Sequence, residues 1–203
     1  MRPKIWDFLV DNLKNIYYII NMKTKTLLIE SAKYGNFEVL YDAEDEDKIS
    51  KYKWGITKDY NKFYVRTKVL DPNGGFYPRP DGRREKRRKS LKLHQLIMET
   101  PKGMHTDHIN GNSLDNRKEN LRICTASENG CNRGPTKNNT SGYKGIFRYG
   151  CGKKWQASIK YLGKNIHIGC FKDKKEAARA YDKKAIELHG EFAYTNFPIE
   201  DYQ

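Results

Sequence analysis

Long apolar runs and paired cysteines are two features that this sequence lacks. No stretch of about 18 uncharged apolar residues occurs, so the sequence predicts no membrane span. The four cysteines are scattered without a Cys-x-x-Cys pair, which argues against a zinc ribbon or a disulfide scaffold. We expect small buried thiols in a reducing compartment, with a redox role as the less favoured alternative. The chain is therefore expected to be cytoplasmic and not secreted.

Negative charge is also scarce relative to positive charge. The 203 residues include 39 Lys+Arg and 25 Asp+Glu, which gives a formal net charge of +14. Aromatic residues make up 12%, too many for a disordered tail. This length and composition predict two or three small folded units with cationic surfaces. Nucleic acid is the default partner of such a chain, and a basic protein that coats nucleic acid is one alternative.

Residues 1–21 are interpreted as an N-terminal extension. Apolar positions in this segment follow helical spacing, but Asp7, Asp11 and Lys14 interrupt the apolar run. The segment also lacks a small-residue cleavage site, so it predicts a short amphipathic helix rather than a signal peptide. An upstream extension before an alternative start at Met22 is the other interpretation.

Residues 22–90 predict an accessory β-rich unit that carries a basic loop. Three short segments are rich in β-forming residues and bounded by Gly, Asn or Asp: Thr26–Glu30, Phe37–Tyr41 and Phe63–Val69. A strong turn signal at Asp71–Gly75 then opens a Pro/Gly segment that ends in a basic run. We expect this run to be a flexible loop that contacts phosphates, through Arg83, Arg84, Arg87 and Arg88. Nuclear targeting is the alternative interpretation.

The most informative part of the sequence begins at an Asp-His pair. Asp107 and His108 are adjacent, so on a strand their side chains would point to opposite faces. Downstream, Thr125-x-x-Glu128 is a capping box, which predicts a helix that carries Asn129 in its first turn. The expected order is a strand, a loop and a helix, with metal ligands contributed from both ends.

The segment Asp-His-Ile-Asn-Gly-Asn at 107–112, with Asn-Leu-Arg at 120–122, resembles the His-Asn-His (HNH) nucleases. The likeness is greatest to their homing-endonuclease branch, which occurs in phage genomes and introns. The resemblance covers Leu93–Asn132 and implies a ββα-metal motif inside a nuclease core at 91–134.

By position, the resemblance also implies roles for individual residues. His108 would be the general base, and Asn120 would orient that histidine and steady the loop. Asp107 and Asn129 would bind the metal, although histidine is commoner at the second of these positions. Two oxygen ligands, with phosphate and water, suit one Mg²⁺ or Mn²⁺ per site better than Zn²⁺. His94 matches a Leu-His-x-Leu segment of the family, but a packed structural histidine is the preferred interpretation.

A polar linker at 135–142 precedes a different pattern, which predicts three short strands and one helix. In the middle strand Trp155, Ala157 and Ile159 share one face, and Lys154, Gln156, Ser158 and Lys160 share the other. Asp173-x-x-Glu176 predicts the start of the helix and Gly190 its end. The helix would cover one face of the sheet and leave the opposite face free.

This module, at 143–198, resembles the APETALA/ethylene-response-factor DNA-binding domain over Ser141–Pro198. The shared segments are Tyr-Lys-Gly-Ile, Lys-Trp-Gln-Ala, Glu-Ala-Ala-Arg-Ala-Tyr-Asp and Asn-Phe-Pro. The resemblance implies that the free face of the sheet enters the major groove. The matching positions are Lys144, Arg148, Tyr149, Lys154, Trp155, Ser158, Lys160, Asn165 and His167. Several family arginines are Lys, Phe, Tyr or Asn here, so we do not expect the plant-type target sequence.

Together these features predict an α+β chain. It would contain a ββα-metal nuclease core, a small N-terminal β unit and a C-terminal three-stranded antiparallel sheet packed on one helix. The expected function is metal-dependent cleavage of double-stranded DNA by a homing-type endonuclease, as a nick or a double-strand break. No obligate protein partner is indicated, and the cytoplasm of a bacterial or phage-infected cell is the expected compartment. A non-catalytic, sequence-specific DNA-binding regulator is the alternative.

Overall fold

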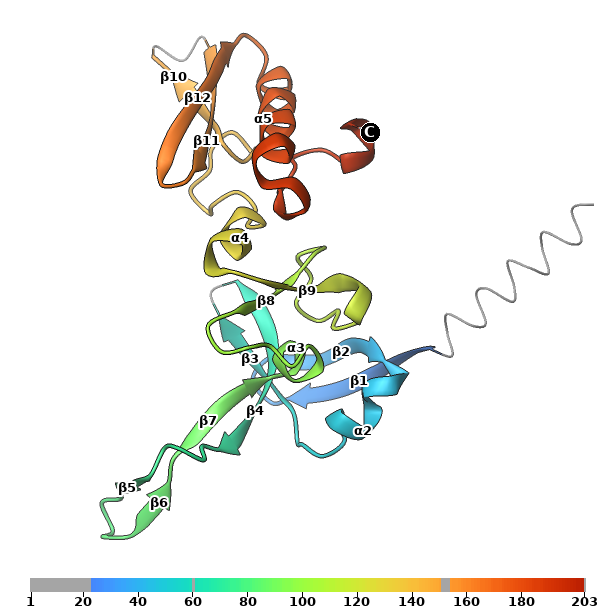
Figure 1. Cartoon of the computed structure of the whole chain (residues 1–203), viewed down its shortest axis with the longest axis vertical. Helices are drawn as coiled ribbons and strands as arrows, with labels where there is room; N and C mark the ends of the chain where they lie inside the picture. Colours follow the sequence, from blue (N-terminus) through green and yellow to red (C-terminus); the bar gives the residue numbers. More distant parts are fainter. Residues whose placement is uncertain (1–22, 60, 151–153, 203) are drawn as a thin grey trace, which may run out of the picture. The chain divides into compact units, whose positions relative to one another are not determined.

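The structure is a computed structural model that describes residues 23–59, 61–150 and 154–202 (Figure 1). It divides into two compact units, residues 1–123 (unit 1) and 124–203 (unit 2). The chain is α+β, with several small antiparallel sheets and few helices, as the sequence predicts. The helix expected at the N-terminus lies outside the described residues. Among the described residues, no helix is long and apolar enough to span a membrane.

Unit 1 begins with a long hairpin and a three-stranded sheet. Strands β1 and β2 pair antiparallel over their full length, because Tyr34 and Gly35 (φ 85°) close a tight turn between them. The second sheet has the order β3-β4-β7. The bounds are β1 Thr24–Ser31, β2 Gly35–Asp42, η1 Ala43–Asp45, α2 Glu46–Ile49, β3 Gly55–Asp59, β4 Lys62–Leu70 and β7 Arg88–Lys92. Each of the three predicted strands is confirmed within one to two residues at either end.

The basic run is not a simple flexible loop. Between β4 and β7 the chain forms a second, shorter hairpin of β5 (Phe76–Pro78) and β6 (Arg84–Lys86), which extends the β4–β7 pair outward (Figure 1). Gly82 (φ 78°) supplies a left-handed conformation in the turn between β5 and β6, and Gly75 (φ 59°) supplies another just before β5. We call residues 71–89 the basic arm, which contains a pair of strands where the sequence predicts a flexible loop.

Residues 22–90 and 91–123 share one hydrophobic core. Buried side chains come from both segments: Ile29, Val39, Tyr41, Ile49, Val65, Leu93, Ile97 and Leu121. Helix α3 (Leu93–Ile97) contributes Leu93, which is fully buried, and Ile97. The accessory β segment and the segment that carries the Asp-His pair therefore pack as one body. Strands β8 (His105–His108) and β9 (Leu121–Cys124), with η2 (Lys118–Asn120) before β9, form a two-stranded sheet in this body.

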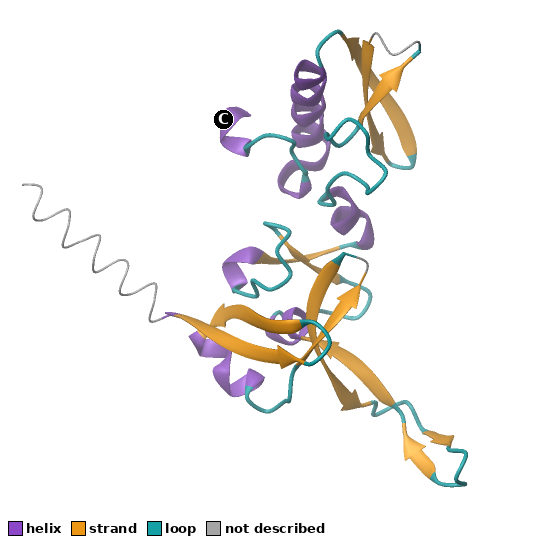
Figure 2. Ribbon diagram, turned by 180° about the vertical axis from the view of Figure 1, so that it is seen from behind, coloured by secondary structure: helices purple, strands orange, loops and turns teal. Residues whose placement is uncertain are grey.

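Unit 2 contains the predicted sheet and helix. Figure 2 shows helix α5 along one side of the sheet, whose strand order is β10-β11-β12. Asp173 caps α5 by accepting hydrogen bonds from the N–H groups of Lys175 and Glu176, and Gly190 (φ 53°) ends it, as the sequence predicts. The bounds are α4 Ala126–Cys131, β10 Ile146–Tyr149, β11 Lys154–Tyr161, β12 Lys164–Phe171, α5 Lys174–His189, η3 Gly190–Phe192 and η4 Ile199–Tyr202.

The core of unit 2 is built on small helical residues. Ala177, Ala178 and Ala185 on α5 are fully buried, which lets the helix lie close to Ala157 of the sheet. Gly145, just before β10, has φ +75°, and a Cβ there would lie 2.1 Å from Tyr181 Cε2. A side chain at that position would therefore clash with the helix that covers the sheet.

Candidate functional site

The Asp-His pair lies at the end of β8, inside unit 1. Asp107 is 9% exposed and His108 is 6% exposed, and Thr106 before them is also buried. Burial lowers the pKa of the His108 imidazole, because the charged form loses its hydration. The imidazole is therefore neutral near pH 7, the form in which a histidine can accept a proton.

Two side chains hold the His108 ring. Nε2 lies 3.3 Å from the Oδ1 of Asn116, and the ring of His94 meets it edge to face with centroids 4.9 Å apart. His94 is itself buried, and burial lowers its pKa to about 3. His94 is thus a packed neutral histidine. The sequence alone assigns no role to Asn116, because a loop separates it from His108 and the sequence does not specify the path of that loop.

Asn120 closes the loop between the two strands. Its Oδ1 accepts a hydrogen bond from the Asn110 N–H at 2.9 Å, and its Nδ2 donates to the Asp115 carbonyl at 2.8 Å. The backbone N–H of Ile109 also donates to the Asn120 carbonyl at 2.8 Å. Asn120 therefore fixes the loop that carries Asn116, and the Nε2 of His108 has the amide of Asn116 as a hydrogen-bond partner.

Asp107 forms an ion pair with Arg122 of β9. Its Oδ2 lies 2.8 Å from Nη2 and 3.2 Å from Nε of the guanidinium, and both side chains are 10% exposed. A carboxylate is the donor that Mg²⁺ and Mn²⁺ prefer, and Mg²⁺ needs only one or two of them, since water and phosphate complete its coordination. Asp107 fits such an ion on chemical grounds. In the part of the chain that the structure describes, no group of three His, Cys, Asp or Glu residues could hold a metal.

Asn129 belongs to unit 2, on α4. The predicted capping box is confirmed: the Thr125 hydroxyl accepts from the Glu128 N–H at 3.2 Å, and the Glu128 carboxylate accepts from the Thr125 N–H at 2.7 Å. Asn129 follows in the first turn, half-buried, with its N–H donated to the Thr125 carbonyl. The cap thus fixes the start of α4, and this start places Asn129 in the first turn of the helix.

The sheet of unit 2 places six of the predicted DNA contacts on one face. Antiparallel partners share a face, so the register joins Tyr149 with Lys154, Ser158 with His167, and Lys160 with Asn165. Ala157 and Ile159, which alternate with them on β11, are buried against α5. We call the opposite side the free face, and these contacts lie on it: Tyr149, Lys154, Ser158, Lys160, Asn165 and His167.

Arg148 and Trp155 lie on the other face of the same sheet. They are partners in the β10–β11 register, and the Arg148 guanidinium stacks 4.1 Å from the Trp155 ring centroid. Trp155 also packs against the α5 core. This pair does not lie on the free face, because successive residues of a strand point to opposite faces and the neighbours of each lie on the free face.

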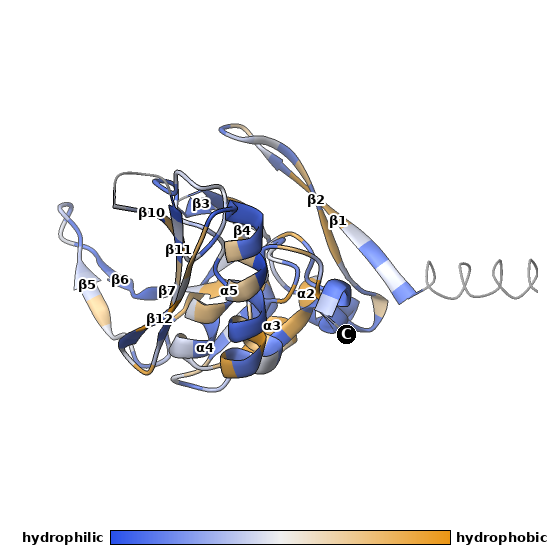
Figure 3. Ribbon diagram, turned by 90° about the horizontal axis from the view of Figure 1, so that it is seen from above, coloured by the Kyte–Doolittle hydropathy of each residue, from blue (hydrophilic) through white to orange (hydrophobic). Residues whose placement is uncertain are grey.

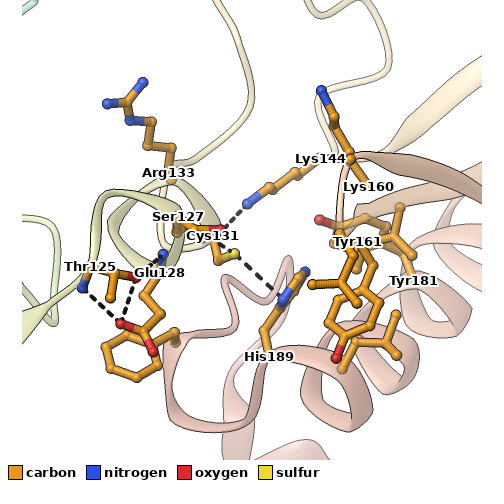
Figure 4. A pocket seen from close by; sticks show the side chains of 16 residues that line it. Thr125, Ser127, Glu128, Cys131, Arg133, Lys144, Lys160, Tyr161, Tyr181 and His189 are labelled. Carbon is orange, nitrogen blue, oxygen red and sulfur yellow. Dashed lines mark hydrogen bonds between the residues drawn. The ribbon is translucent and has the colours of Figure 1, made fainter.

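Lys144 points into a pocket instead of across the sheet (Figure 4). Its Nζ donates to the Cys131 carbonyl at 2.5 Å, and burial lowers its pKa to about 8. The Cys131 thiol in turn lies 3.4 Å from His189 Nδ1. The pocket encloses about 760 Å³ between α4, the β11–β12 turn and the end of α5. Lys144 therefore ties α4 to the module.

Three residues that the sequence did not indicate as DNA contacts complete the free face. Phe147, Gln156 and Cys170 form a single row across the sheet, because Phe147 pairs with Gln156 and Gln156 with Cys170. Phe147 is 52% exposed. Gln156 was already on the correct face in the alternating pattern, whereas the positions of Phe147 and Cys170 depend on a strand register that the sequence does not specify.

The basic arm carries the remaining predicted contacts. Its four arginines are all exposed, and β6 and β7 are coloured as hydrophilic in Figure 3. Phe76 (56% exposed) lies beside them, with Lys86 Nζ 6.0 Å from its ring centroid. The arm thus presents a cationic surface: Arg83, Arg84, Arg87 and Arg88.

Part of the chain matches a family model, and the chain is also similar to a phage protein. A family model described as HNH endonuclease matches residues 94–131, which include His94, Asp107 and His108. Protein 3.8 of Escherichia phage T7 is 37% identical over 93 residues, which cover 46% of this chain and 76% of that protein.

Two further relatives carry names that match the two predicted modules. An uncharacterized HNH endonuclease of Acanthamoeba polyphaga mimivirus is 33% identical over 106 residues, covering 51% of this chain and 54% of the relative. The ethylene-responsive transcription factor WRI1 of Arabidopsis thaliana is 31% identical over 108 residues, which cover 52% of this chain and 24% of the plant protein. This chain thus spans about half of the one relative and a quarter of the other. The chain belongs to the HNH endonuclease family and carries an APETALA2-like domain.

Proposed function

We propose that this chain is a divalent-metal-dependent endonuclease of the homing type that hydrolyses phosphodiester bonds of double-stranded DNA. The observation that carries the proposal is the buried, neutral His108 beside Asp107 at the end of β8, within the residues that the HNH model matches. We further propose that β8, β9 and α4 form the ββα-metal motif of the nuclease core.

His108 would act as the general base. When its Nε2 donates a hydrogen bond to the Asn116 Oδ1, the basic lone pair is left on Nδ1. Nδ1 then takes a proton from a water molecule, whose oxygen attacks the phosphorus. The bond from phosphorus to the 3′ oxygen breaks, which leaves a 5′-phosphate and a 3′-hydroxyl after the leaving oxygen is protonated. Loss of such a base lowers rates by roughly 10²–10⁴-fold.

Asp107 and Asn129 would hold Mg²⁺ or Mn²⁺ through their oxygen atoms. When bound, the ion supplies Lewis acidity that stabilises negative charge on the phosphate and on the leaving oxygen. Arg122 neutralises the Asp107 carboxylate at 2.8 Å and so lets that charge remain buried. Asn120 keeps the loop closed, which holds Asn116 against the imidazole.

The free face and the basic arm would position the enzyme on DNA. A small nuclease site contacts mostly the phosphate backbone, so sequence preference has to come from contacts elsewhere. The free face carries Lys154 and Lys160, and the arm carries four exposed arginines. We propose that the free face of unit 2 reads bases and that the basic arm of unit 1 contacts phosphates.

The test is cleavage of supercoiled plasmid in Mg²⁺, Mn²⁺ or EDTA. Wild type would be compared with His108→Ala and with the control His105→Ala, which removes an exposed histidine from the same strand. We expect metal-dependent nicking or linearisation, lost in His108→Ala, retained in His105→Ala, with DNA binding intact in all three. Equal cleavage by His108→Ala would refute the assignment of the base.

A non-catalytic DNA-binding regulator is the second candidate. The observation that favours it is the Arg122–Asp107 ion pair, because the guanidinium occupies the carboxylate that a metal would need. Specific binding without cleavage in any divalent ion would support the regulator.

A further inference from the structure

The free face of the unit 2 sheet has a chemistry that selects particular bases. Strands β10, β11 and β12 contain no Asp or Glu, so the face is positive or neutral throughout. Its lysines, Lys154 and Lys160, lie on β11, and the two free-face residues between them, Gln156 and Ser158, are uncharged. Such a surface complements the phosphates of duplex DNA, and the major groove is wide enough to admit β-strands.

The row at the centre of this face contains one amide between an apolar ring and a thiol. Gln156 lies on the middle strand, directly between Phe147 on β10 and Cys170 on β12. In the part of the chain that the structure describes, the Gln156 amide makes no side-chain hydrogen bond. Its donor and acceptor are thus available to a ligand that approaches the face.

We propose that this row reads an A·T base pair, with Gln156 on the adenine and Phe147 against the thymine methyl group. A glutamine amide can accept from adenine N6 and donate to adenine N7 at the same time, and a phenyl ring suits the methyl that only thymine exposes. Guanine is bound best by Arg or Lys in the same groove. Arg148, the arginine of β10, stacks on Trp155 on the other side of the sheet.

The flanking rows fit the same approach. Neighbouring strands lie about 4.8 Å apart, so Phe147 and Gln156 can reach the two bases of one pair or of adjacent pairs. Lys154 and Lys160 lie on either side of Gln156 along β11, two and four residues away. Their long side chains can contact phosphates while the shorter Gln156 amide faces base edges.

This inference rests on the proposal that the free face docks on DNA, and selection of bound duplexes from a random library tests it. The full chain would be used in EDTA, so that cleavage does not deplete the bound DNA. We expect one position at which adenine is preferred by roughly 5- to 150-fold. Gln156→Ala should abolish the preference at that position alone. Gln156→Glu should change it to cytosine, because a carboxylate accepts from cytosine N4; misfolding cannot produce such a switch.

Arg148→Ala is the matched control from the opposite face, and it should leave the preferred sequence unchanged. The inference is overturned if wild type selects no sequence, if Gln156→Ala selects the same sequence as wild type, or if Arg148→Ala alone removes the preference. Duplex RNA bound as tightly as DNA would also overturn it, because the A-form major groove is too narrow for side chains to read. If wild type cleaves plasmid but Gln156→Ala does not change the selected sequence, the nuclease proposal stands and the base-reading proposal fails. If wild type prefers adenine but does not cleave, only the base-reading proposal stands.

Discussion

The side chain of Asn116 faces His108, with its Oδ1 3.3 Å from the histidine Nε2. Asn116 is 1% exposed, and its backbone N–H is held at 2.7 Å by the Leu40 carbonyl of β2. The amide that contacts Nε2 of His108 is therefore anchored to the long N-terminal hairpin. The accessory β segment thus contributes directly to the geometry of the proposed base.

Replacement of Asn116 by Ala should lower cleavage without weakening DNA binding. Without this acceptor, the imidazole loses a contact that favours one tautomer, so we expect a fall of about 10- to 100-fold in the single-turnover rate, less than for removal of the base itself. Asn138→Ala, at an exposed linker position, is the control and should cleave normally. Unchanged cleavage by Asn116→Ala would show that the tautomer is fixed by other contacts.

Replacement of Arg122 by Ala should destabilise the metal-free protein strongly. The change removes the guanidinium from the buried Asp107 carboxylate, and breaking a buried ion pair costs about 3–5 kcal/mol of the free energy of unfolding. Mg²⁺ should restore part of this stability if Asp107 binds the ion. Urea unfolding with and without Mg²⁺ measures both effects. The control Arg179→Ala breaks an exposed pair with Asp201 and should cost less than about 1 kcal/mol. Stabilisation by Mg²⁺ that is equal in both variants would contradict the role of Asp107.

Burial of His94 should make the stability of unit 1 depend on pH. Its pKa is lowered from 6.5 to about 3, so between these values the unfolded chain binds a proton that the folded chain does not. The contribution to stability is complete above pH 6.5 and decreases as the pH falls, by up to about 1.4 kcal/mol for each pH unit. His94→Phe should flatten the profile of unfolding free energy against pH. Parallel profiles for wild type and His94→Phe would contradict the burial of a neutral His94.

Gly145 should tolerate no side chain. An added Cβ would lie 2.1 Å from Tyr181 and 2.7 Å from the Ser158 carbonyl, at φ +75°. We expect Gly145→Ala to cost more than about 4 kcal/mol and to abolish binding through unit 2. Gly150 also has a positive φ, but an added Cβ there would meet open space. Gly150→Ala should therefore cost only about 1–2 kcal/mol of the free energy of unfolding. Thermal unfolding compares the two, and equal melting temperatures would show that the helix can move away from the strand.

The basic arm should contribute to affinity through phosphates. Alanine at Arg83, Arg84, Arg87 and Arg88 together should weaken binding of all DNA sequences alike. The slope of log affinity against log salt should fall by about 0.9 for each phosphate that the arm no longer neutralises. A charge-matched control replaces four exposed lysines elsewhere: Lys51, Lys53, Lys137 and Lys183. If both variants show the same reduction in slope, the arm contributes only its charge and makes no positioned contacts.

Local signals in the sequence predicted much of this structure. The capping residues Thr125 and Asp173 are both confirmed, because a cap depends on groups within three residues. The alternation along β11 correctly placed Ala157 and Ile159 in the core, since a strand has a period of two residues. These features depend on neighbours in the chain and are therefore visible without a structure.

Relationships between distant segments could not be predicted in the same way. The face of Arg148 depends on the β10–β11 register, and one extra residue of β12 at Ile168 shifts the pairing with β11. The contact of Asn116 with His108 depends on how a loop returns, and the strand pairing of the basic arm depends on hydrogen bonds across a long hairpin. Such placements follow from tertiary pairing, which short-range patterns do not encode.

The most direct test of the central claim is the chemistry of the cleaved DNA ends. Wild type, with Mg²⁺ in water labelled with heavy oxygen, should leave a labelled 5′-phosphate and an unlabelled 3′-hydroxyl, and His108→Ala should leave the DNA intact. DNA that wild type binds but never cleaves in any divalent ion would contradict the account and leave a DNA-binding regulator.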